Sequence, residues 1–474
     1  MLFCSLQFLL FFTVVFSVYW AMPWHKARVW LLLTASFYFY ANWNYWLAAI
    51  IAVSTTLDYL IGRGLDGSSS PACRRLLLAC SLVGNLGLLA YFKYVNFFLR
   101  SVEALLHEAG DTSSLPVLQV IVPIGISFYT FEAINYTVDI YRGKAPAERN
   151  LGYFMLFITF FPHLIAGPIV RAKDFLPQIR RLKRWDWARL ELGAQYMLLG
   201  LFKKLAIADH LALYVDPVFA DPTKYSSEAV WIATLAYALQ IYCDFSGYTD
   251  MAIGTAHMLG YKLAKNFNLP YIAVNISEFW HRWHISLSTW LRDYLFIPLG
   301  GSRGTRLFVA RNLMITMILG GLWHGASWTF AFWGFLHGAL LILHRIFREF
   351  CQVYSEFDVA LQSVLGTMLR RCLTFLAVAI CWIFFRSISF NIAVEMMDRL
   401  IVRHGGLGSP LPSLNVVYIY FVFALGHVLS YTGAWKIFRM QMPAPAIGLS
   451  YAAMLSLTLI LAPGSSKTFI YFQF

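Results

Sequence analysis

Residues 2–24 read LFCSLQFLLFFTVVFSVYWAMPW and contain no charged side chain. A helix needs roughly 20 consecutive apolar residues to cross a bilayer, and this run supplies that length. Residues 29–57 form a second stretch without any charge. Two such stretches in succession are typical of chains that cross a membrane repeatedly, so the N-terminal part already predicts a membrane-embedded protein.

The rest of the chain repeats this pattern. Charged residues make up only 13% of the 474 residues, against about 25% in soluble globular domains. We therefore predict an all-α polytopic membrane protein, a single domain over residues 1–474, with about ten or eleven spans. The further apolar runs that support this prediction are residues 76–92, 117–131, 151–170, 229–243, 313–335, 373–385, 413–434 and 446–464.

Basic residues gather in short loops and give the chain a net charge of +13. Lys26 and Arg28 follow the first apolar run, so we expect no cleaved signal peptide and an N-terminus on the outer side of the membrane. The densest basic cluster, residues 171–189, is interpreted as a cytoplasmic loop against anionic lipid. A site for a polyanionic cofactor such as coenzyme A is the alternative, and we expect no nucleic-acid partner.

Polar residues interrupt the middle third of the chain, where they are costly and therefore indicate function. Residues 280–301 read WHRWHISLSTWLRDYLFIPLGG. If residues 280–294 form one helix, His281, His284 and Ser288 share a face beside a face of three tryptophans. This pattern is typical of an interfacial or re-entrant helix.

Two other stretches are expected to break the alternation of span and loop. His163 lies in FFPHLIAGPIV, residues 160–170, where the prolines predict a bent or re-entrant segment. Asp244 lies in the apolar stretch IYCDFSGYTDMAIG, residues 241–254. The segment 347–371 is expected to form an interfacial helix between spans.

His324 is the strongest catalytic candidate. It follows GGLW and precedes GASW in an apolar run, and the flanking glycines would let a substrate or a backbone approach the imidazole closely. An imidazole with a pKa of about 6.5 suits general-base catalysis, for example the attack of a hydroxyl on a thioester. The alternative is a hydrogen-bonded structural histidine. No Gly-x-Ser-x-Gly motif or Cys–His pairing supplies another nucleophile.

Several motifs together resemble the membrane-bound O-acyltransferase family. FWHRWHISLSTWLRDYLFIPLGGSR at residues 279–303 and GGLWHGASW at residues 320–328 are the most specific. Within the family the chain is most similar to the bacterial alginate O-acetylases that modify exported polysaccharides. Supporting similarity lies at residues 122–143, 161–171, 243–254 and 469–474.

The resemblance implies about eleven transmembrane helices, with re-entrant elements, around a central tunnel. It implies that His324 and His284 are catalytic, that acetyl-CoA is the donor and that no metal is needed. The chain would lie in the bacterial inner membrane, surrounded by lipid. The acetyl group would cross this membrane to extracytoplasmic acetyltransferase or acceptor proteins, which modify alginate or cellulose. Candidates for the lining of the substrate cavity are Trp323, Arg282, Ser288, His163 and Asp244.

Three alternatives remain open from the sequence. The acceptor could be peptidoglycan or another envelope polymer. The chain could instead be a proton-coupled transporter with His324 and Asp244 in a relay, although no internal repeat supports this. A zinc site built from His281, His284 and His324 is a third interpretation, but no Cys, Asp or Glu completes the set.

Overall fold

The computed structural model describes residues 1–111, 114–165, 167–410, 413–434, 440–462 and 469–470. Its regular elements in these ranges are helices, and one isolated β-bridge pairs Tyr225 with Leu407. This composition confirms the all-α prediction. Contacts divide the chain into two compact units, Met1–Met197 with Met251–Ala264, and Leu198–Asp250 with Lys265–Phe474. The single domain over residues 1–474 stays a prediction.

Six helices of the described ranges are long and apolar enough to cross a membrane. Helix α1 (Leu6–Ala21) and residues 416–432 are shorter apolar helices of the same kind. This confirms a multi-pass membrane protein, while the number of about eleven spans and the central tunnel stay predictions. The six helical segments are Tyr45–Gly67, Pro71–Glu108, Arg306–His324, Trp328–Val353, Val364–Arg386 and Ala444–Leu461.

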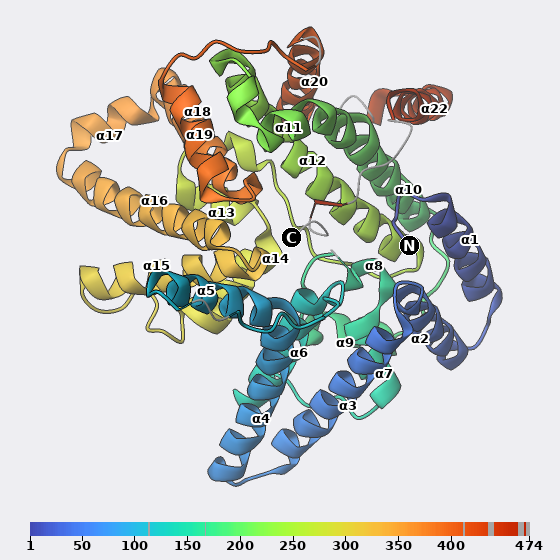
Figure 1. The fold of residues 1–474 in the computed structure, drawn as a ribbon. Helices are drawn as coiled ribbons and strands as arrows, with labels where there is room; N and C mark the ends of the chain where they lie inside the picture. The colour runs from blue at the N-terminus through green and yellow to red at the C-terminus, as the bar shows by residue number, and fades with distance from the viewer. Residues whose placement is uncertain (112–113, 166, 411–412, 435–439, 463–468, 471–474) are drawn as a thin grey trace. The chain divides into compact units, whose positions relative to one another are not determined.

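In the first unit, the apolar stretch 29–57 divides into two helices because Asn44 caps the second. Its Oδ1 accepts hydrogen bonds from the backbone N–H groups of Trp46 and Leu47. Figure 1 shows α3 and α4 as a hairpin. The helices of this unit are α1, α2 (His25–Ala41), α3 (Tyr45–Gly67), α4 (Pro71–Leu89), α5 (Val95–Glu108), α6 (Ile126–Tyr141), α7 (Leu151–Thr159), α8 (Phe161–Leu164), α9 (Ala172–Arg180) and most of α10 (Trp187–Leu201).

The predicted apolar span at residues 117–131 is wrong for its first half, because α6 begins only at Ile126. Gly125 precedes it with a φ of 78°. A Cβ at this position would lie 2.6 Å from the carbonyl oxygen of Leu164. Glycine therefore allows both the left-handed turn and the close approach of the α8 backbone.

Residues 160–170 are bent, as predicted. Helix α7 ends at Thr159, α8 is a single turn, and α9 begins at Ala172. Two buried side chains of α6 hold the backbone of Val170 between them. Its N–H donates to Glu132 Oε1 at 2.8 Å, and its carbonyl accepts from Asn135 Nδ2 at 3.0 Å. These bonds satisfy backbone groups that a helix would otherwise pair.

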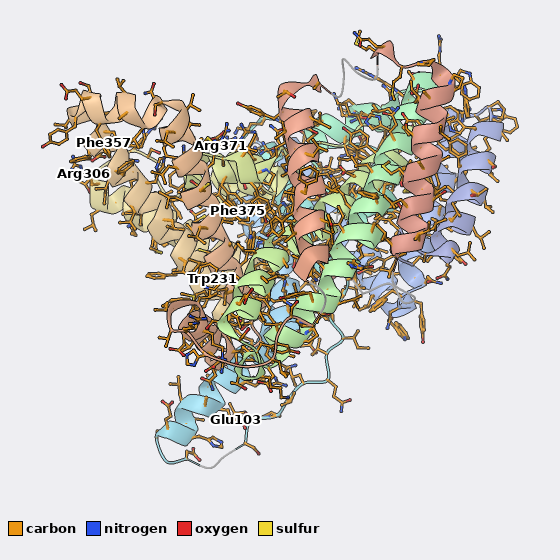
Figure 2. The ribbon with its side chains drawn as sticks, turned by 90° about the horizontal axis from the view of Figure 1, so that it is seen from above. Glu103, Trp231, Arg306, Phe357, Arg371 and Phe375 are labelled. Carbon is orange, nitrogen blue, oxygen red and sulfur yellow. The ribbon has the colours of Figure 1, made fainter. Side chains whose placement is uncertain are left out.

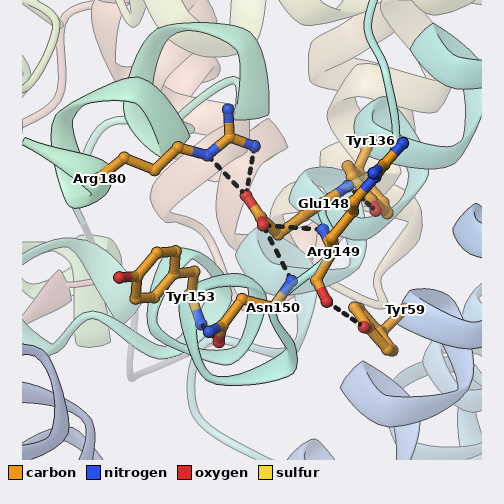
Figure 3. A network of polar contacts seen from close by, with 7 residues as sticks. All are labelled: Tyr59, Tyr136, Glu148, Arg149, Asn150, Tyr153 and Arg180. Carbon is orange, nitrogen blue, oxygen red and sulfur yellow. Dashed lines mark hydrogen bonds and ion pairs between the residues drawn. The ribbon is translucent and has the colours of Figure 1, made fainter. Parts of the chain in front are cut away.

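The loop between α6 and α7 is fixed by the buried carboxylate of Glu148 (Figure 3). Glu148 Oε1 accepts from the backbone N–H groups of Arg149 and Asn150, and Oε2 accepts from the guanidinium of Arg180. The Glu148 backbone N–H donates to the hydroxyl of Tyr136 at 3.0 Å. The network ties α6, α7 and α9 together within this unit.

In the second unit, α15 and α16 form a hairpin rather than the single apolar run predicted at 313–335 (Figure 1). Glycines permit the close approach, since a Cβ on Gly321 would lie 2.2 Å from the Phe330 carbonyl oxygen. The helices are α11 (Asp209–Ala220), the 227–250 part of α12 (Ser227–Met258), α13 (Ile276–Arg282), α14 (Ile285–Leu291), α15 (Arg306–His324), α16 (Trp328–Val353), α17 (Ser355–Gln362), α18 (Val364–Arg386), α19 (Phe390–Ile401), α20 (Ser413–Thr432) and α22 (Ala444–Leu461).

Two local predictions in this unit are wrong. The segment 347–371 is no single interfacial helix but the end of α16, the short α17 and the start of α18, where Figure 2 labels Phe357 and Arg371. The stretch 241–254 does not break the chain into separate elements either, because α12 is helical throughout. The ammonium group of Lys204 compensates the charge of the Asp244 carboxylate, so the helix need not break.

Candidate active site

His284 lies at a sharp turn between two short helices. Helix α13 ends at Arg282 and α14 begins at Ile285, and His284 between them has φ 41° and ψ 54°. The predicted continuous helix over residues 280–294 is therefore wrong, and His281 and His284 do not share a face. His281 is exposed and His284 is fully buried. A left-handed non-glycine residue is uncommon and often marks a functional position.

Asn266 fixes the tautomer of His284. Asn266 Oδ1 accepts from the backbone N–H of Ser286 at 3.1 Å and from the Ser286 hydroxyl at 2.9 Å. Because a backbone N–H can only donate, this atom must be the amide oxygen. The 3.1 Å contact between Asn266 Oδ1 and His284 Nδ1 then requires the proton on Nδ1. The lone pair of the neutral ring consequently lies on Nε2.

The Nε2 atom of His284 is buried and has no hydrogen-bond partner in the described part of the chain. Burial lowers the pKa of His284 to about 3, because the surrounding groups cannot solvate an imidazolium. The ring is therefore neutral at physiological pH. A buried acceptor without a partner costs about 1–3 kcal/mol, which a hydrogen-bond donor on a bound molecule would recover.

His324 is the last residue of α15 and is 4% exposed. Aromatic rings surround it, with centroids 5.0 Å away in Trp323 and 5.2 Å away in both Trp333 and Phe385. The His284 ring is a further neighbour at 6.3 Å. The structure thus brings together the two histidines that sequence motifs 40 residues apart single out.

The glycine after His324 has a packing role. A Cβ on Gly325 would lie 2.2 Å from the Phe330 ring. The chain can therefore leave α15 and enter α16 within three residues, and Phe330 can pack edge-on against Phe385 at 4.8 Å. This glycine was predicted to let a substrate or a backbone approach the imidazole, but its close neighbour in the structure is instead the Phe330 side chain.

Three predicted lining residues lie beside the histidine pair. The Trp323 ring lies 5.8 Å from that of His284. The Ser288 hydroxyl donates to the Trp283 carbonyl at 3.1 Å, and Arg282 binds Glu278 Oε1 and the Asn268 carbonyl. These bonds stabilise the turn around His284. The assignment of the three residues to the lining of a substrate cavity stays a prediction.

Asp244 is held in a buried ion cluster. Lys204 Nζ contacts Asp244 Oδ1 and lies 2.8 Å from Asp209 Oδ1. Asp244 Oδ2 accepts from the backbone N–H of Ile470 at 2.8 Å, which anchors the described part of the C-terminal motif 469–474. Residues 471–474 of that motif lie outside the described residues. The next residue on α12, Phe245, packs edge-on against His284 at 4.7 Å.

His163, the remaining candidate, belongs to the first unit. It is buried on α8, and its Nε2 lies 3.3 Å from Glu132 Oε2. Glu132 also accepts a hydrogen bond from the Val170 backbone N–H, so His163 contacts the residue that stabilises the bent segment. Its assignment to a cavity lining stays a prediction.

Two residues of this arrangement were missed from sequence. Asn266 lies in the polar gap YKLAKNFNLPY after α12, where only its position before the histidine motif could draw attention. Lys204 gave a clearer signal, because Lys203-Lys204 interrupts the apolar run LLGLFKKLAIA. Charges in such runs are usually paired, and Asp244 and Asp250 were available partners. The structure pairs Lys203 with Asp250 at 2.6 Å.

In the described ranges no group of three or more His, Cys, Asp or Glu side chains could hold a metal ion. The zinc alternative needs His281 beside His284, but His281 is exposed and its Nδ1 lies 2.6 Å from the Ser277 carbonyl oxygen. That a metal is not required stays a prediction.

Comparisons with known proteins agree with the motifs. A family model described as "MBOAT, membrane-bound O-acyltransferase family" matches residues 144–385. A "Probable alginate O-acetylase AlgI" of Azotobacter vinelandii is 43% identical over 84% of this chain and 77% of its own length. The protein of the same description from Pseudomonas putida is 37% identical, with 100% of both chains covered. A "Peptidoglycan O-acetyltransferase" of Helicobacter pylori is 36% identical over 80% of this chain and 74% of its own length.

Proposed function

This chain belongs to the membrane-bound O-acyltransferase family, and from that premise we propose that it transfers acetyl groups from cytoplasmic acetyl-CoA to an exported polysaccharide. The observation that carries the proposal is the buried His284–His324 pair, which lies within the residues that the family model matches. The enzyme would lie in a bacterial inner membrane and work with extracytoplasmic acetyltransferase or acceptor proteins.

His324 is the proposed general base. Its ring takes the proton of an acceptor hydroxyl while the hydroxyl oxygen attacks the thioester carbonyl carbon. The carbon–sulfur bond then breaks, and the imidazolium returns the proton to the departing thiolate, so that an ester and free coenzyme A result. His324 rather than His284 is assigned this role because it stands in the glycine-flanked motif GGLWHGASW.

His284 is the proposed positioning residue. Its Nε2 can accept a hydrogen bond but cannot donate one, since the Asn266 amide holds the proton on Nδ1. A thioester carbonyl offers no donor to this atom. A neighbouring sugar hydroxyl or an amide N–H of the coenzyme A arm does, so Nε2 orients substrate beside His324.

Alginate is the proposed acceptor, because relatives that cover most of this chain are described as probable alginate O-acetylases. Peptidoglycan is the second candidate, which the Helicobacter pylori relative supports. Cellulose, also predicted from the motifs, has no support from these relatives.

The acceptor is tested by deleting the gene and measuring ester-linked acetate in each isolated polymer. We expect alginate to lose its acetate and to regain it when the wild-type gene is restored. Loss from peptidoglycan or cellulose alone, with alginate unchanged, would contradict the alginate assignment. Unchanged acetate in all three polymers would contradict polysaccharide acetylation itself.

Asn266→Asp is expected to move the acidic limb of the pH–rate profile to higher pH by at least about one unit. An ionised carboxylate at Nδ1 stabilises the imidazolium and so raises the pKa of His284. The ring then becomes protonated on Nε2 as the pH falls, and it loses the acceptor that the wild-type ring keeps.

Asn275→Asp is the matched control for that measurement. Asn275 caps α13 by accepting from the Glu278 N–H at 2.8 Å, and aspartate caps a helix equally well. This variant adds the same charge nine residues away and should keep the wild-type profile. An unchanged acidic limb in Asn266→Asp would refute the role assigned to Asn266.

A further inference from the structure

A cavity of about 830 Å³ lies at one end of the spans α16 and α18, beneath the short helix α17. Its walls come from these helices and from the start of α13. Helix α16 ends at Val353 and α18 begins at Val364, so the cavity lies where two spans leave the membrane core. Spans of this length would place their ends near the lipid headgroups.

Basic groups converge on this cavity. Arg348 and Arg370 line it together with His344, which stands one turn before Arg348 on α16. In the described part of the chain neither arginine forms an ion pair, and Arg370 Nε is buried without a hydrogen-bond partner. The cavity therefore presents donors that lack an acceptor.

One carboxylate also lines the cavity. Asp358 Oδ2 already accepts a hydrogen bond from Gln362 Nε2 at 2.6 Å, within α17. Two arginines against this one carboxylate give the lining a formal charge of +1. The neighbouring Arg345 differs from them, because it pairs with Glu349 at 3.7 Å.

Some of the apolar lining residues are exposed at the surface. Leu343, Leu369 and Leu373 are 60%, 54% and 56% exposed. Exposed leucines on spanning helices face acyl chains rather than water. Basic residues at this end of α16 and α18 also indicate the cytoplasmic side, whose leaflet contains anionic lipid.

We propose that this cavity binds the phosphate headgroup of an anionic phospholipid of the cytoplasmic leaflet. The arginines bind the phosphate oxygens, for which guanidinium groups have a matching planar geometry. The exposed leucines contact the acyl chains. The site is independent of the acetyl transfer proposed for His324.

The test uses the full-length protein, extracted from nanodiscs of phosphatidylcholine with a minor fraction of phosphatidylglycerol. Native mass spectrometry then counts each lipid that remains bound. The wild type is expected to retain phosphatidylglycerol in preference to phosphatidylcholine. The double variant Arg348→Gln/Arg370→Gln should bind phosphatidylglycerol on the order of tenfold more weakly.

Two further variants make the result interpretable. Arg345→Gln/Arg371→Gln removes the same charge from the same helices outside the cavity lining, and should retain the lipid. Arg348→Lys/Arg370→Lys keeps the charge and should restore much of the binding. Equal retention by the cavity and control variants would overturn the proposal. A second result would also overturn the proposal: Arg348→Gln/Arg370→Gln retains phosphatidylglycerol but no longer binds added coenzyme A. The cavity would then bind a nucleotide phosphate instead of a lipid phosphate.

Discussion

His324→Ala is expected to lower acetyl transfer at least about 100-fold, because general-base assistance is typically worth about 10²–10⁴ in rate. Without the imidazole, no group takes the proton from the hydroxyl as its oxygen attacks the thioester. The measurement is ester-linked acetate on the isolated polymer in a deletion strain that expresses the variant. The acetate is expressed per amount of enzyme in the membrane.

His324→Gln separates chemistry from packing. Alanine leaves a void among the rings of Trp323, Trp333 and Phe385, whereas glutamine fills most of the volume but cannot act as a base. Both variants should be inactive, and His324→Gln should reach the wild-type level in the membrane. His281→Ala removes an exposed imidazole from the neighbouring helix and should keep full activity. Normal acetylation by His324→Gln would exclude this residue as the base.

His284→Ala should lower kcat/KM by about tenfold to hundredfold, the cost of losing a buried hydrogen bond to substrate. The alanine variant also strains the left-handed turn, so its loss has two causes. His284→Asn is the sharper test. Asparagine tolerates this backbone conformation, and its Nδ2 can donate to Asn266 as His284 Nδ1 does.

The asparagine variant lacks only the Nε2 acceptor. We expect it to fold normally, with a thermal stability near that of the wild type, and to lose about tenfold in kcat/KM, no more than the alanine variant loses. A positioning role should raise KM for at least one substrate, which a purely structural role would not do. Wild-type values of kcat/KM and KM in His284→Asn would show that His284 has only a structural role.

The fold class follows from local properties that a sequence displays. Charge-free runs such as residues 2–24 predict spanning helices from length and hydropathy alone. The prolines around His163 predict the bend that the structure shows. His324 stood out because an imidazole in an apolar, glycine-flanked run is rare.

The errors come from interactions between distant residues. Helix α12 continues through Asp244 because Lys204, 40 residues earlier in the chain, neutralises that carboxylate. The turn at His284 depends on Asn266, 18 residues before it. The Ile285 N–H also donates to the Asn266 carbonyl at 2.9 Å, which a continuous helix over residues 280–294 could not accommodate. Helical periodicity within residues 241–254 or 280–294 contains no information about Lys204 or Asn266, because both partners lie outside these stretches.

The most direct test of the account follows the acetyl group across the membrane. Sealed inside-out vesicles from the producing organism receive acetyl-labelled acetyl-CoA on their outer, formerly cytoplasmic face. We predict that label accumulates as ester on polymer or acceptor protein in the vesicle lumen, and that His324→Gln vesicles of equal enzyme content accumulate at least about 100-fold less. Equal luminal labelling in the two kinds of vesicle would contradict the central role of His324.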